Sequence, residues 1–327
     1  MNEDLDQYLE RFKNLQAIVW GDLILDEYIY TSTSRISREA PVLVTEFEAN
    51  AFKLGGGGNV IMNIKSLGAE PIPVGLVGKD ADGAALLSLL KENDITTDYL
   101  IEVEGYKTPK KSRILSGGAS TKKQQILRID SLNKIPLKTG TYRHIEKQII
   151  HLLGKMDLLI LSDYLHESVR PEVFGHIRKK FPDKLYIADS RQHFPNFKNI
   201  TIATPNEPEI KKMFPGKSFL TDTDFFEAGT EFLHRIGAEG VVLKRGHRGM
   251  AVIDKNKQPR VVGIYGSTDI VDVTGAGDTV ISVLGLALQA GADLYDSARL
   301  ANMAAGIVVM KEGCYPIPYD ELHHVLR

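Results

Sequence analysis

The stretch VDVTGAGDTV, residues 271–280, places two aspartates around a Thr-Gly-Ala-Gly core late in the chain. Val271 ends an apolar run typical of a strand, and VISVLGLALQA, residues 280–290, has the composition of a buried helix. The two glycines allow a tight backbone between them, so Asp278 is predicted at or near a helix N-terminus. Amides there favour negative charge on a transferring group, and a carboxylate there can accept a proton from an attacking hydroxyl. The competing interpretation of Asp278 is an ordinary helix-start acid after a glycine turn.

The composition limits the class of protein around this stretch. The chain has 327 residues, 43% hydrophobic and 25% charged, which suffices for one large domain or two smaller ones. With 40 basic and 42 acidic residues the net charge is -2, so neither a nucleic acid nor a membrane partner is expected. A single cysteine, Cys314, excludes an internal disulfide. The polar, acidic N-terminus is no signal peptide, and we predict a cytoplasmic globular protein.

Short apolar runs typical of buried strands alternate with segments of helical period. The strand candidates are residues 17–20, 72–76, 158–161, 185–188 and 240–243, and the helix candidates are residues 2–14, 59–67, 83–92, 142–153 and 224–236. This alternation predicts βαβ units in a mostly parallel sheet covered on both faces. Residues 28–52 and 106–130 instead alternate apolar and polar side chains, which predicts half-solvated antiparallel strands. We expect one α/β domain over residues 1–327, with a β lid from about 28–52 and 106–130.

Two glycine-containing motifs resemble the signatures of one enzyme family. DVTGAGD, residues 272–278, resembles the second signature of the PfkB (ribokinase-like) carbohydrate kinases. GGGGNVIMNIKSLGAEPIPVGLVG, residues 55–78, resembles the first signature, although Ile61 stands where the family usually has a small residue. The resemblance extends from Ile18 to about Ile317. It implies a ribokinase-like three-layer α/β/α fold, with a mostly parallel central sheet and a small β-sheet lid.

The similarity is greatest to one branch, the D-glycero-D-manno-heptose-7-phosphate kinases of lipopolysaccharide core synthesis. It rests on GDLILDEYIY at 21–30, TSRISREAPVLV at 33–44 and QQILRID at 124–130. The implied reaction transfers the γ-phosphoryl group of ATP, with Mg²⁺, to a hydroxyl of a sugar or sugar phosphate, giving heptose 1,7-bisphosphate in this branch. Because the sequence ends at Arg327, we do not expect the nucleotidyltransferase domain that is fused to some heptose kinases.

The resemblance assigns roles around the second signature. Asp278 would be the catalytic base. Amides expected to stabilise the transferring phosphoryl group are those of Gly275, Ala276 and Gly277. Asp272 and Thr274 match residues that shape a monovalent-cation site in several relatives, so K⁺ is a further candidate cofactor.

A second group of residues is expected to bind the sugar. Short carboxylates accept hydrogen bonds from adjacent hydroxyls, the glycine run allows a ligand to approach the backbone, and an asparagine can both donate and accept. The candidates are Asp22, Asp26, Arg35, Gly56, Gly57 and Asn59, with Ser37 and Glu39 beside the arginine. Helix capping or solvent exposure is the alternative for the two aspartates. A solvated or dimer-contact role is the alternative for Arg35.

A third group is expected to bind the nucleotide. Asn206 and Glu209 of TPNEPE match the pattern that orders Mg²⁺ through water in relatives, which suits a hard cation that retains its waters. VVLKRGHRGM, residues 241–250, resembles the segment along the nucleotide phosphates. Its Lys244 stands where a small hydroxyl residue is frequent, and a cation there could still neutralise phosphate. The remaining candidates are Gly246, Gly249 and Asn302, the last in a segment whose apolar residues equally suit a core helix.

Two departures leave the substrate open. His166-Glu167 stands where the branch commonly has Lys-Gly, and Ser190-Arg191 follows Asp189 where it has Pro-Lys. A substrate that carries its own phosphate needs a cationic side chain to bind that phosphate. One lid segment has several basic residues that could do so, although they could equally form a solvated face. They are Lys110, Lys111, Arg113, Lys122 and Lys123.

Two other functions compete with a heptose kinase. One is a kinase of the same family acting on fructose, ribose or a nucleoside, and the other is a sugar- or nucleotide-binding relative without turnover. Because the exposed edge of an alternating lid sheet suits pairing with another chain, we expect a homodimer formed through the lid.

Overall fold

The central layer of the molecule is a mostly parallel β-sheet. The structure, a computed structural model, describes residues 3–118, 123–132, 137–266 and 270–326. Within these residues a 9-stranded sheet has the order β13-β12-β11-β10-β9-β8-β1-β4-β5. Its strands are β1 (Gln16–Gly21), β4 (Glu70–Gly78), β5 (Leu100–Val103), β8 (Leu158–Asp163), β9 (Leu185–Ser190), β10 (Ile202–Ala203), β11 (Gly240–Lys244), β12 (Met250–Asp254) and β13 (Arg260–Val262). Neighbours from β5 to β11 pair in parallel, whereas β12 and β13 pair antiparallel.

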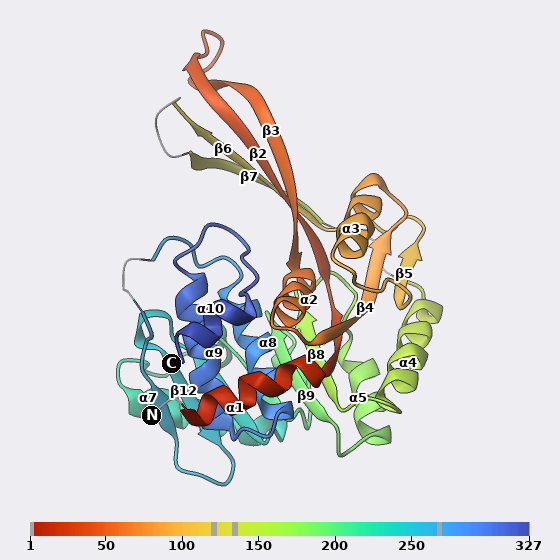
Figure 1. The fold of residues 1–327 in the computed structure, drawn as a ribbon, viewed down its shortest axis with the longest axis vertical. Coiled ribbons are helices and arrows are strands. Elements are labelled where there is room, and N and C mark those ends of the chain that lie inside the picture. The colour runs from red at the N-terminus through yellow and green to blue at the C-terminus, as the bar shows by residue number, and fades with distance from the viewer. Residues whose placement is uncertain (1–2, 119–122, 133–136, 267–269, 327) are drawn as a thin grey trace.

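Helices cover both faces of this sheet, because successive apolar residues of the strands point to opposite sides. In β1, Ala17 and Val19 join one hydrophobic core, while Ile18 and Trp20 join the other. The first core is closed by α1 (Glu3–Arg11), α2 (Gly57–Ser66), α3 (Ala81–Glu92), α8 (Ala276–Gln289), α9 (Leu294–Val308) and α10 (Tyr319–His324). The second is closed by α4 (Thr139–Leu153), α5 (Pro171–Lys180), α6 (Glu207–Met213) and α7 (Asp222–Ile236). The predicted three-layer α/β/α fold is confirmed (Figure 1).

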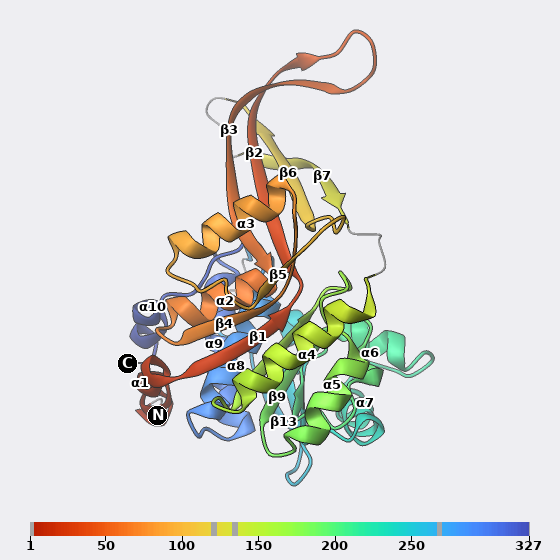
Figure 2. The same ribbon diagram turned by 90° about the vertical axis from the view of Figure 1, so that its right-hand side faces the viewer.

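The lid is a second, four-stranded sheet that projects from the body of the molecule (Figures 1 and 2). It consists of β2 (Leu23–Ile36), β3 (Leu43–Gly56), β6 (Lys110–Gly117) and β7 (Gln124–Ser131), in the order β3-β2-β6-β7. The prediction of antiparallel strands is correct for the two hairpins but wrong for β2 and β6, which pair in parallel. Both strands leave the body in the same direction, so their contact is parallel. Residues 119–122 of the predicted lid lie outside the described residues.

The segment before the second signature differs from the prediction. Val271 ends no strand: its N–H and that of Asp272 both donate to the carbonyl oxygen of Val309, at 2.9 and 3.1 Å. Val309 is the C-cap of α9, so this segment satisfies a free carbonyl at a helix end instead of extending the sheet. The predicted helix does follow, and it begins at Ala276.

Candidate active site

The site lies where the chain changes direction across the main sheet. From β1 the chain moves outward to β4 and β5, and then returns to β8 on the other side of β1. Loops at the carboxyl ends of β1 and β8 therefore diverge, which is the usual position of a binding crevice in a parallel sheet. Asp22 follows β1 directly and Tyr164 follows β8.

Three separate segments meet at the carboxylate of Asp278, in the first turn of α8. Asn59 Nδ2, from the first turn of α2, donates to Asp278 Oδ2 at 3.0 Å. The Tyr164 hydroxyl donates to Oδ1 at 2.7 Å. Gly275 precedes the helix with a φ of 82°, and a Cβ there would lie 2.6 Å from Asn59 Nδ2. The glycine therefore allows Asn59 to reach the carboxylate, and two predicted site residues 219 positions apart are brought together.

Burial raises the pKa of Asp278 to about 6, with a further contribution from the nearby Asp189, although Asn59, Tyr164 and Lys244 act in the opposite direction. The side chain is 4% exposed. A carboxylate with a pKa close to neutral is a better proton acceptor than an ordinary aspartate, yet it remains ionised at pH 7. The environment of Asp278 thus suits a general base.

The amides predicted to stabilise a transferring group lie at the start of α8. Ala276 N–H has a partner within the turn, the carbonyl oxygen of Val273 at 3.3 Å. Gly277 follows in the first helical turn, where N–H groups lack intrahelical acceptors. Gly277 and the N-cap Gly275 therefore remain the better candidates of the three.

Asp22 does not have the open position expected of a sugar ligand. Its carboxylate is 1% exposed and accepts three backbone N–H bonds, from Tyr164, His166 and Ser168, at 2.7–3.0 Å. These bonds hold the loop after β8 against the end of β1. The three bonds account for Asp22 as a support of the loop that carries Tyr164, and its contact with the sugar stays a prediction.

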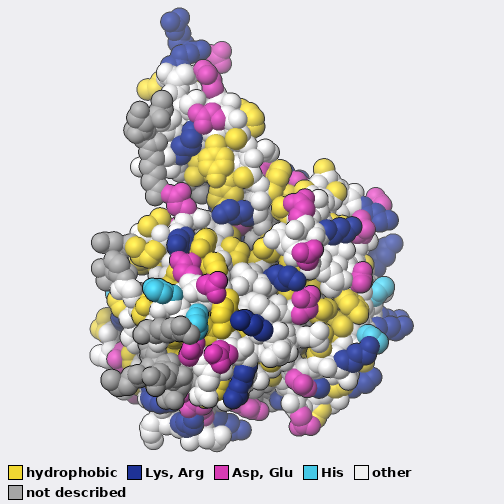
Figure 3. Space-filling view, viewed as in Figure 1, with side chains coloured by type: hydrophobic (Ala, Val, Ile, Leu, Met, Phe, Trp, Pro, Cys, Tyr) yellow, Lys and Arg dark blue, Asp and Glu magenta, His cyan; other side chains and the backbone are white. Residues whose placement is uncertain are grey.

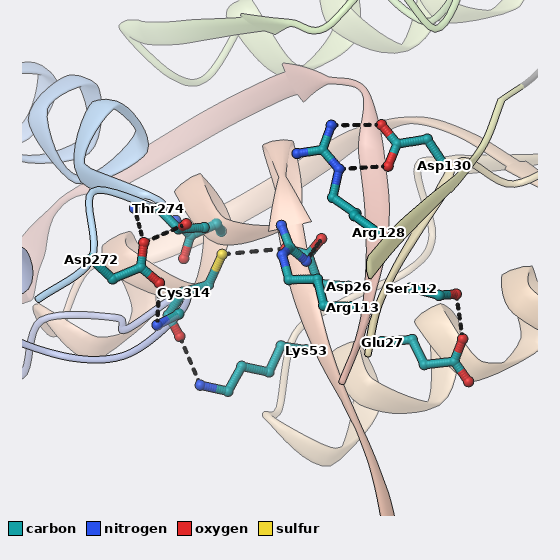
Figure 4. A network of polar contacts seen from close by, with 12 residues as sticks. Asp26, Glu27, Lys53, Ser112, Arg113, Arg128, Asp130, Asp272, Thr274 and Cys314 are labelled. Atoms are coloured by element: carbon teal, nitrogen blue, oxygen red, sulfur yellow. Dashed lines mark hydrogen bonds and ion pairs between the residues drawn. The ribbon is translucent and has the colours of Figure 1, made fainter. Parts of the chain in front are cut away.

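Asp26 lies in a buried polar network at the base of the lid (Figure 4). Arg113 Nη1 donates to Asp26 Oδ1 at 2.7 Å, and the guanidinium carbon lies 5.2 Å from the ring centroid of Tyr28. Cys314 Sγ donates to Oδ2 at 3.3 Å, while Lys53 Nζ donates to the Cys314 carbonyl oxygen at 3.1 Å. The network joins β2, β3 and β6 to the loop after α9, so Asp26 is held where the lid meets the body.

The glycine run is explained by close packing. A Cβ on Gly56, whose φ is 56°, would lie 2.8 Å from the Asp22 carbonyl oxygen, and one on Gly57 would lie 3.2 Å from it. Gly57 N–H donates to that same oxygen at 2.9 Å. These contacts anchor the start of α2, and with it Asn59, to the end of β1.

Arg35 is not brought to this site within the chain. It is exposed near the outer end of β2, nine positions beyond Asp26, or about 30 Å at ~3.3 Å per strand residue. Figure 2 shows how far this hairpin extends from the body. The neighbouring Ser37 Oγ accepts the Glu39 N–H at 3.1 Å, a local turn contact. Within one chain Arg35 therefore lies apart from the other predicted sugar ligands, and its contact with the sugar stays a prediction.

A cavity of about 760 Å³ opens beside the first turn of α8. Ala276 and Gly277 contribute to its wall, together with the side chains and backbone of several loops. Five of the predicted nucleotide-binding residues line it: Asn206, Lys244, Gly246, Gly249 and Asn302. Its apolar wall includes Met250, Ile264, Tyr265, Val280 and Val309. A large cavity with one apolar side and polar groups near the helix end suits a nucleotide, with its base on the apolar side.

Asn206 and Glu209 form a capping box at the start of α6. Asn206 Oδ1 accepts the Glu209 N–H at 2.9 Å, and Glu209 Oε2 accepts the Asn206 N–H at 2.8 Å. Burial raises the pKa of Glu209, and the nearby Asp189 raises it further. Lys244 compensates the acidic pair of Glu209 and Asp189 only in part, which favours a further cation, so the residues fit Mg²⁺. The described residues contain no cluster of three His, Cys, Asp or Glu that could hold a metal directly, which is compatible with an ion bound mainly by phosphates and water.

Asp272 and Thr274 close the turn before α8. Asp272 Oδ1 accepts the N–H of Thr274 at 2.9 Å and its hydroxyl at 2.7 Å, and Oδ2 accepts the Gly313 N–H at 2.9 Å. Figure 4 shows these side chains beside Cys314. Their hydrogen bonds account for both residues as turn-forming groups, and a monovalent-cation site here remains a proposal.

Some of the predicted lid cations form ion pairs with carboxylates. Lys110 pairs with Asp82 at 2.7 Å, Arg113 with Asp26, and Lys123 with Glu48 at 2.6 Å. Lys122 lies outside the described residues. Lys111 instead lies over the Tyr164 ring, 5.2 Å from its centroid, and Arg191 lies 4.8 Å from the same centroid. Neither has a carboxylate partner among the described residues.

Sequence reasoning missed two residues of the site. Tyr164 is not among the predicted site residues, and Asp189 entered only as part of a departure from the branch. Both stand at the carboxyl ends of parallel strands, β8 and β9. Polar residues at that position of neighbouring strands were the signal that could have identified them.

Comparison with protein families gives a match over residues 15–321 to the pfkB family carbohydrate kinases. The chain belongs to this family. It is therefore an enzyme of the phosphotransferase class with an alcohol group as acceptor, and kinases of this family use ATP with Mg²⁺.

Curated relatives at moderate identity support the same assignment. The bifunctional protein HldE of Desulfatibacillum aliphaticivorans is 35% identical over 97% of this chain and 64% of its own length. HldE of Proteus mirabilis is 34% identical over 98% of this chain and 65% of its own length. The chain thus spans about 65% of the length of the curated relatives it matches.

Solved structures share the fold at low identity. Phosphofructokinase-2 from Escherichia coli, in complex with substrates and products, has a TM-score of 0.76 at 21% identity, over 95% of this chain and 98% of that one. Arabidopsis thaliana ribokinase, complexed with ribose and ATP, has a TM-score of 0.71 at 19% identity, over 96% and 98%. Among the described residues, no helix is long and apolar enough to cross a lipid bilayer.

Proposed function

We propose that the chain forms a single kinase domain that transfers the γ-phosphoryl group of MgATP to a hydroxyl of heptose 7-phosphate. The observation that carries the proposal is the position of Asp278. Its buried carboxylate adjoins the first turn of α8, and that turn forms part of the wall of the nucleotide-sized cavity. A proton acceptor next to a phosphate-binding helix end is what phosphoryl transfer to an alcohol requires.

In this mechanism the acceptor hydroxyl lies at the mouth of the crevice, within reach of Asp278. Asn59 and Tyr164 orient the carboxylate by one hydrogen bond to each oxygen. Asp278 takes the hydroxyl proton as the oxygen attacks, and the amide of Gly277 favours charge on the moving phosphoryl group. The lid excludes water, which would otherwise compete as acceptor. Mg²⁺, when bound, would neutralise phosphate charge, with Asn206 and Glu209 contacting its waters.

Lys111 and Arg191 support an acceptor that carries its own phosphate. Burial lowers the pKa of Lys111, and the charges of Arg191 and Arg113 add to this effect, while the carboxylates of Asp26 and Asp278 oppose it. Two cations over the ring of Tyr164 are therefore mutually repulsive until an anion binds between them. The Tyr164 hydroxyl bonds to Asp278, the proposed base. An anion bound by Lys111 and Arg191 would therefore be separated from the reaction centre by the ring of Tyr164. A phosphate at the far end of a sugar fits this separation.

The choice of heptose rests on the branch resemblance and on the HldE relatives. Site chemistry alone is compatible with other phosphosugars, because a fold does not specify its substrate. Asp26, at the junction of lid and body, is the proposed ligand of the sugar hydroxyls. Cytoplasmic location and a K⁺ requirement through the turn of Asp272 are parts of the same proposal.

We also propose that the chain forms a homodimer through its lid. The lid exposes several large apolar side chains, which Figure 3 shows as yellow groups on the projecting sheet. They include Ile36, Val42, Leu43, Phe47, Leu127 and Ile129. A projecting sheet with open edges and apolar residues is stabilised when a second copy covers it. Such pairing would also give Arg35, at the outer end of β2, a place near the partner's crevice.

An ATP-consumption screen tests the function. Purified protein with MgATP would be offered heptose 7-phosphate, fructose 6-phosphate, free hexoses, ribose and nucleosides in parallel. We expect kcat/KM for heptose 7-phosphate to exceed that for every unphosphorylated sugar by at least about 10-fold, because Lys111 and Arg191 have no anion to contact when the acceptor lacks a phosphate. Higher activity with a free sugar would favour the alternative kinase, and inactivity with all acceptors would favour the binding protein.

A further inference from the structure

An ion pair adjoins the nucleotide-sized cavity through Lys244. Lys244 Nζ, at the end of β11, donates to Asp189 Oδ2, from β9, at 2.6 Å. The side chains are 14% and 19% exposed, so the pair is largely removed from water. Lys244 also lines the cavity. The pair is thus largely buried, and its lysine can still contact a ligand in the cavity.

The pair lies beside the helix end that would receive the phosphoryl group. A Cβ built on Gly277 would be 3.4 Å from Lys244 Nζ and 3.4 Å from Asp189 Oδ2. Gly277 immediately precedes the proposed base, and the charges of Asp189 and Lys244 both act on the carboxylate of Asp278. The ammonium therefore lies next to the position where the transferring group must pass.

The local charge balance favours release of the lysine to a stronger anion. Around the ammonium stand Asp189, Glu209 and Asp278, and Lys244 acts on the charge of both Glu209 and Asp278. The terminal phosphate of ATP carries more negative charge than one carboxylate. A lysine can follow it, because its ammonium is a compact charge on a flexible four-carbon stem.

We propose that Lys244 is a second catalytic group, whose ammonium leaves Asp189 to contact the γ-phosphoryl group in bound ATP and during transfer. This inference rests on the proposed kinase function. A bond forms between the acceptor oxygen and the γ-phosphorus while the bond to the β–γ bridging oxygen breaks. The electron pair of that bond leaves with ADP, and the acceptor proton goes to Asp278. Lys244 keeps its proton throughout, and Asp189 is a positioning residue that holds the ammonium before ATP binds.

Measurements of nucleotide binding distinguish a contact between Lys244 and the γ-phosphate from a general structural role of Lys244 in the cavity. Calorimetry would compare ADP with a non-hydrolysable ATP analogue, both with Mg²⁺, on the parent protein and on Lys244→Met. Methionine retains the apolar stem and loses the charge. We expect affinity for the ATP analogue to fall about 10-fold or more and affinity for ADP to change less than about twofold, because only the former carries a γ-phosphate. Equal losses for both nucleotides, or no loss for either, would overturn the proposal.

Turnover provides the second measurement. In Lys244→Met, kcat should fall about 100- to 1,000-fold, the usual effect of removing one stabilising group from a transferring charge. The matched control is Lys184→Met, which removes a lysine that does not line the cavity and that pairs with Asp157 at 2.6 Å. We expect its kcat to stay within about threefold of the parent. Equal effects of the two substitutions would contradict a specific role.

The pH profile tests Asp189 as a positioning residue. Because a neighbouring cation favours the ionised form of Asp278, Lys244→Met should move the acid limb of kcat/KM to higher pH. Asp189→Asn removes a neighbouring negative charge and should move the limb to lower pH. A merely structural role would move neither limb. If no acceptor supports turnover in the parent protein, the proposed function fails, whereas the calorimetric comparison still decides the contact with the γ-phosphate.

Discussion

Tyr164 donates its hydroxyl to Asp278 Oδ1 at 2.7 Å, across 114 positions of sequence. The bond joins the loop after β8 to the first turn of α8, the two sides of the crevice. Asn59 binds the other carboxylate oxygen from α2. The orientation of the proposed base therefore depends on three segments at once.

Substitution Asp278→Asn should abolish turnover while leaving the fold intact. The amide has nearly the same shape and can still bond to Tyr164, but it cannot take a proton from the acceptor. We expect kcat to fall about 10³-fold or more, with unchanged affinity for ADP. Steady-state kinetics and calorimetry on the same preparation give both values. A kcat within tenfold of the parent would exclude Asp278 as the base.

The activity should fall at acidic pH with a midpoint near 6. The pKa of Asp278 is raised to about 6, and the base acts only when ionised, so log kcat/KM should decline with unit slope below that pH. Tyr164→Phe removes a hydrogen bond that favours the ionised form, which should shift the midpoint to higher pH. Tyr142→Phe is the control, because the Tyr142 hydroxyl bonds to Glu167 and not to the base. Identical midpoints in all three proteins would contradict the assignment.

Asp22→Ala should reduce stability more than its small volume suggests. The substitution leaves the N–H groups of Tyr164, His166 and Ser168 without their buried acceptor. An unsatisfied buried donor costs about 1–3 kcal/mol, so we expect a loss of roughly 3 kcal/mol or more in the free energy of unfolding. Urea denaturation measures it. Asp157→Ala, which removes an exposed partner of Lys184, should change stability by less than about 1 kcal/mol. Comparable losses in the two variants would exclude the loop-supporting role.

Asp26→Asn should impair use of the sugar and spare the nucleotide. The amide keeps a hydrogen bond to Arg113 but accepts sugar hydroxyls more weakly, so we expect KM for the acceptor to rise about tenfold. KM for ATP should stay within about twofold. Glu27→Gln is the control, since this next residue of β2 bonds instead to Ser112 at 2.5 Å. An equal rise in both KM values for Asp26→Asn would place the residue outside the sugar site.

Phe47→Asp should convert a dimer into a monomer. Phe47 is 67% exposed on the lid, and a charge there would be buried at the expected interface. Leu220→Asp is the control, because Leu220 is 85% exposed but lies between α6 and α7, away from the lid. Sedimentation equilibrium at micromolar concentration measures the mass. A monomeric parent protein would disprove the dimer, and a dimeric Phe47→Asp variant would place the interface elsewhere.

Much of the fold could be predicted because its signals are local. Buried strands such as β8 are apolar at nearly every position, and the helices between them repeat with a helical period. The strand expected before Asp272 was wrong because apolar residues there bind the end of α9 instead. The parallel pairing of β2 with β6 was missed because it depends on where two distant hairpins leave the body.

By itself, the sequence of this protein determined the α/β class, the helix that starts at DVTGAGD and five of the residues that line the nucleotide-sized cavity. These follow from periodicity and from glycine spacing, which act over a few residues. Only the tertiary structure decided that Asp22 supports a loop, that Arg35 lies far from Asp26, and that Tyr164 contacts the base. Those facts depend on the direction of strands and on contacts between segments over a hundred positions apart, which no local pattern records.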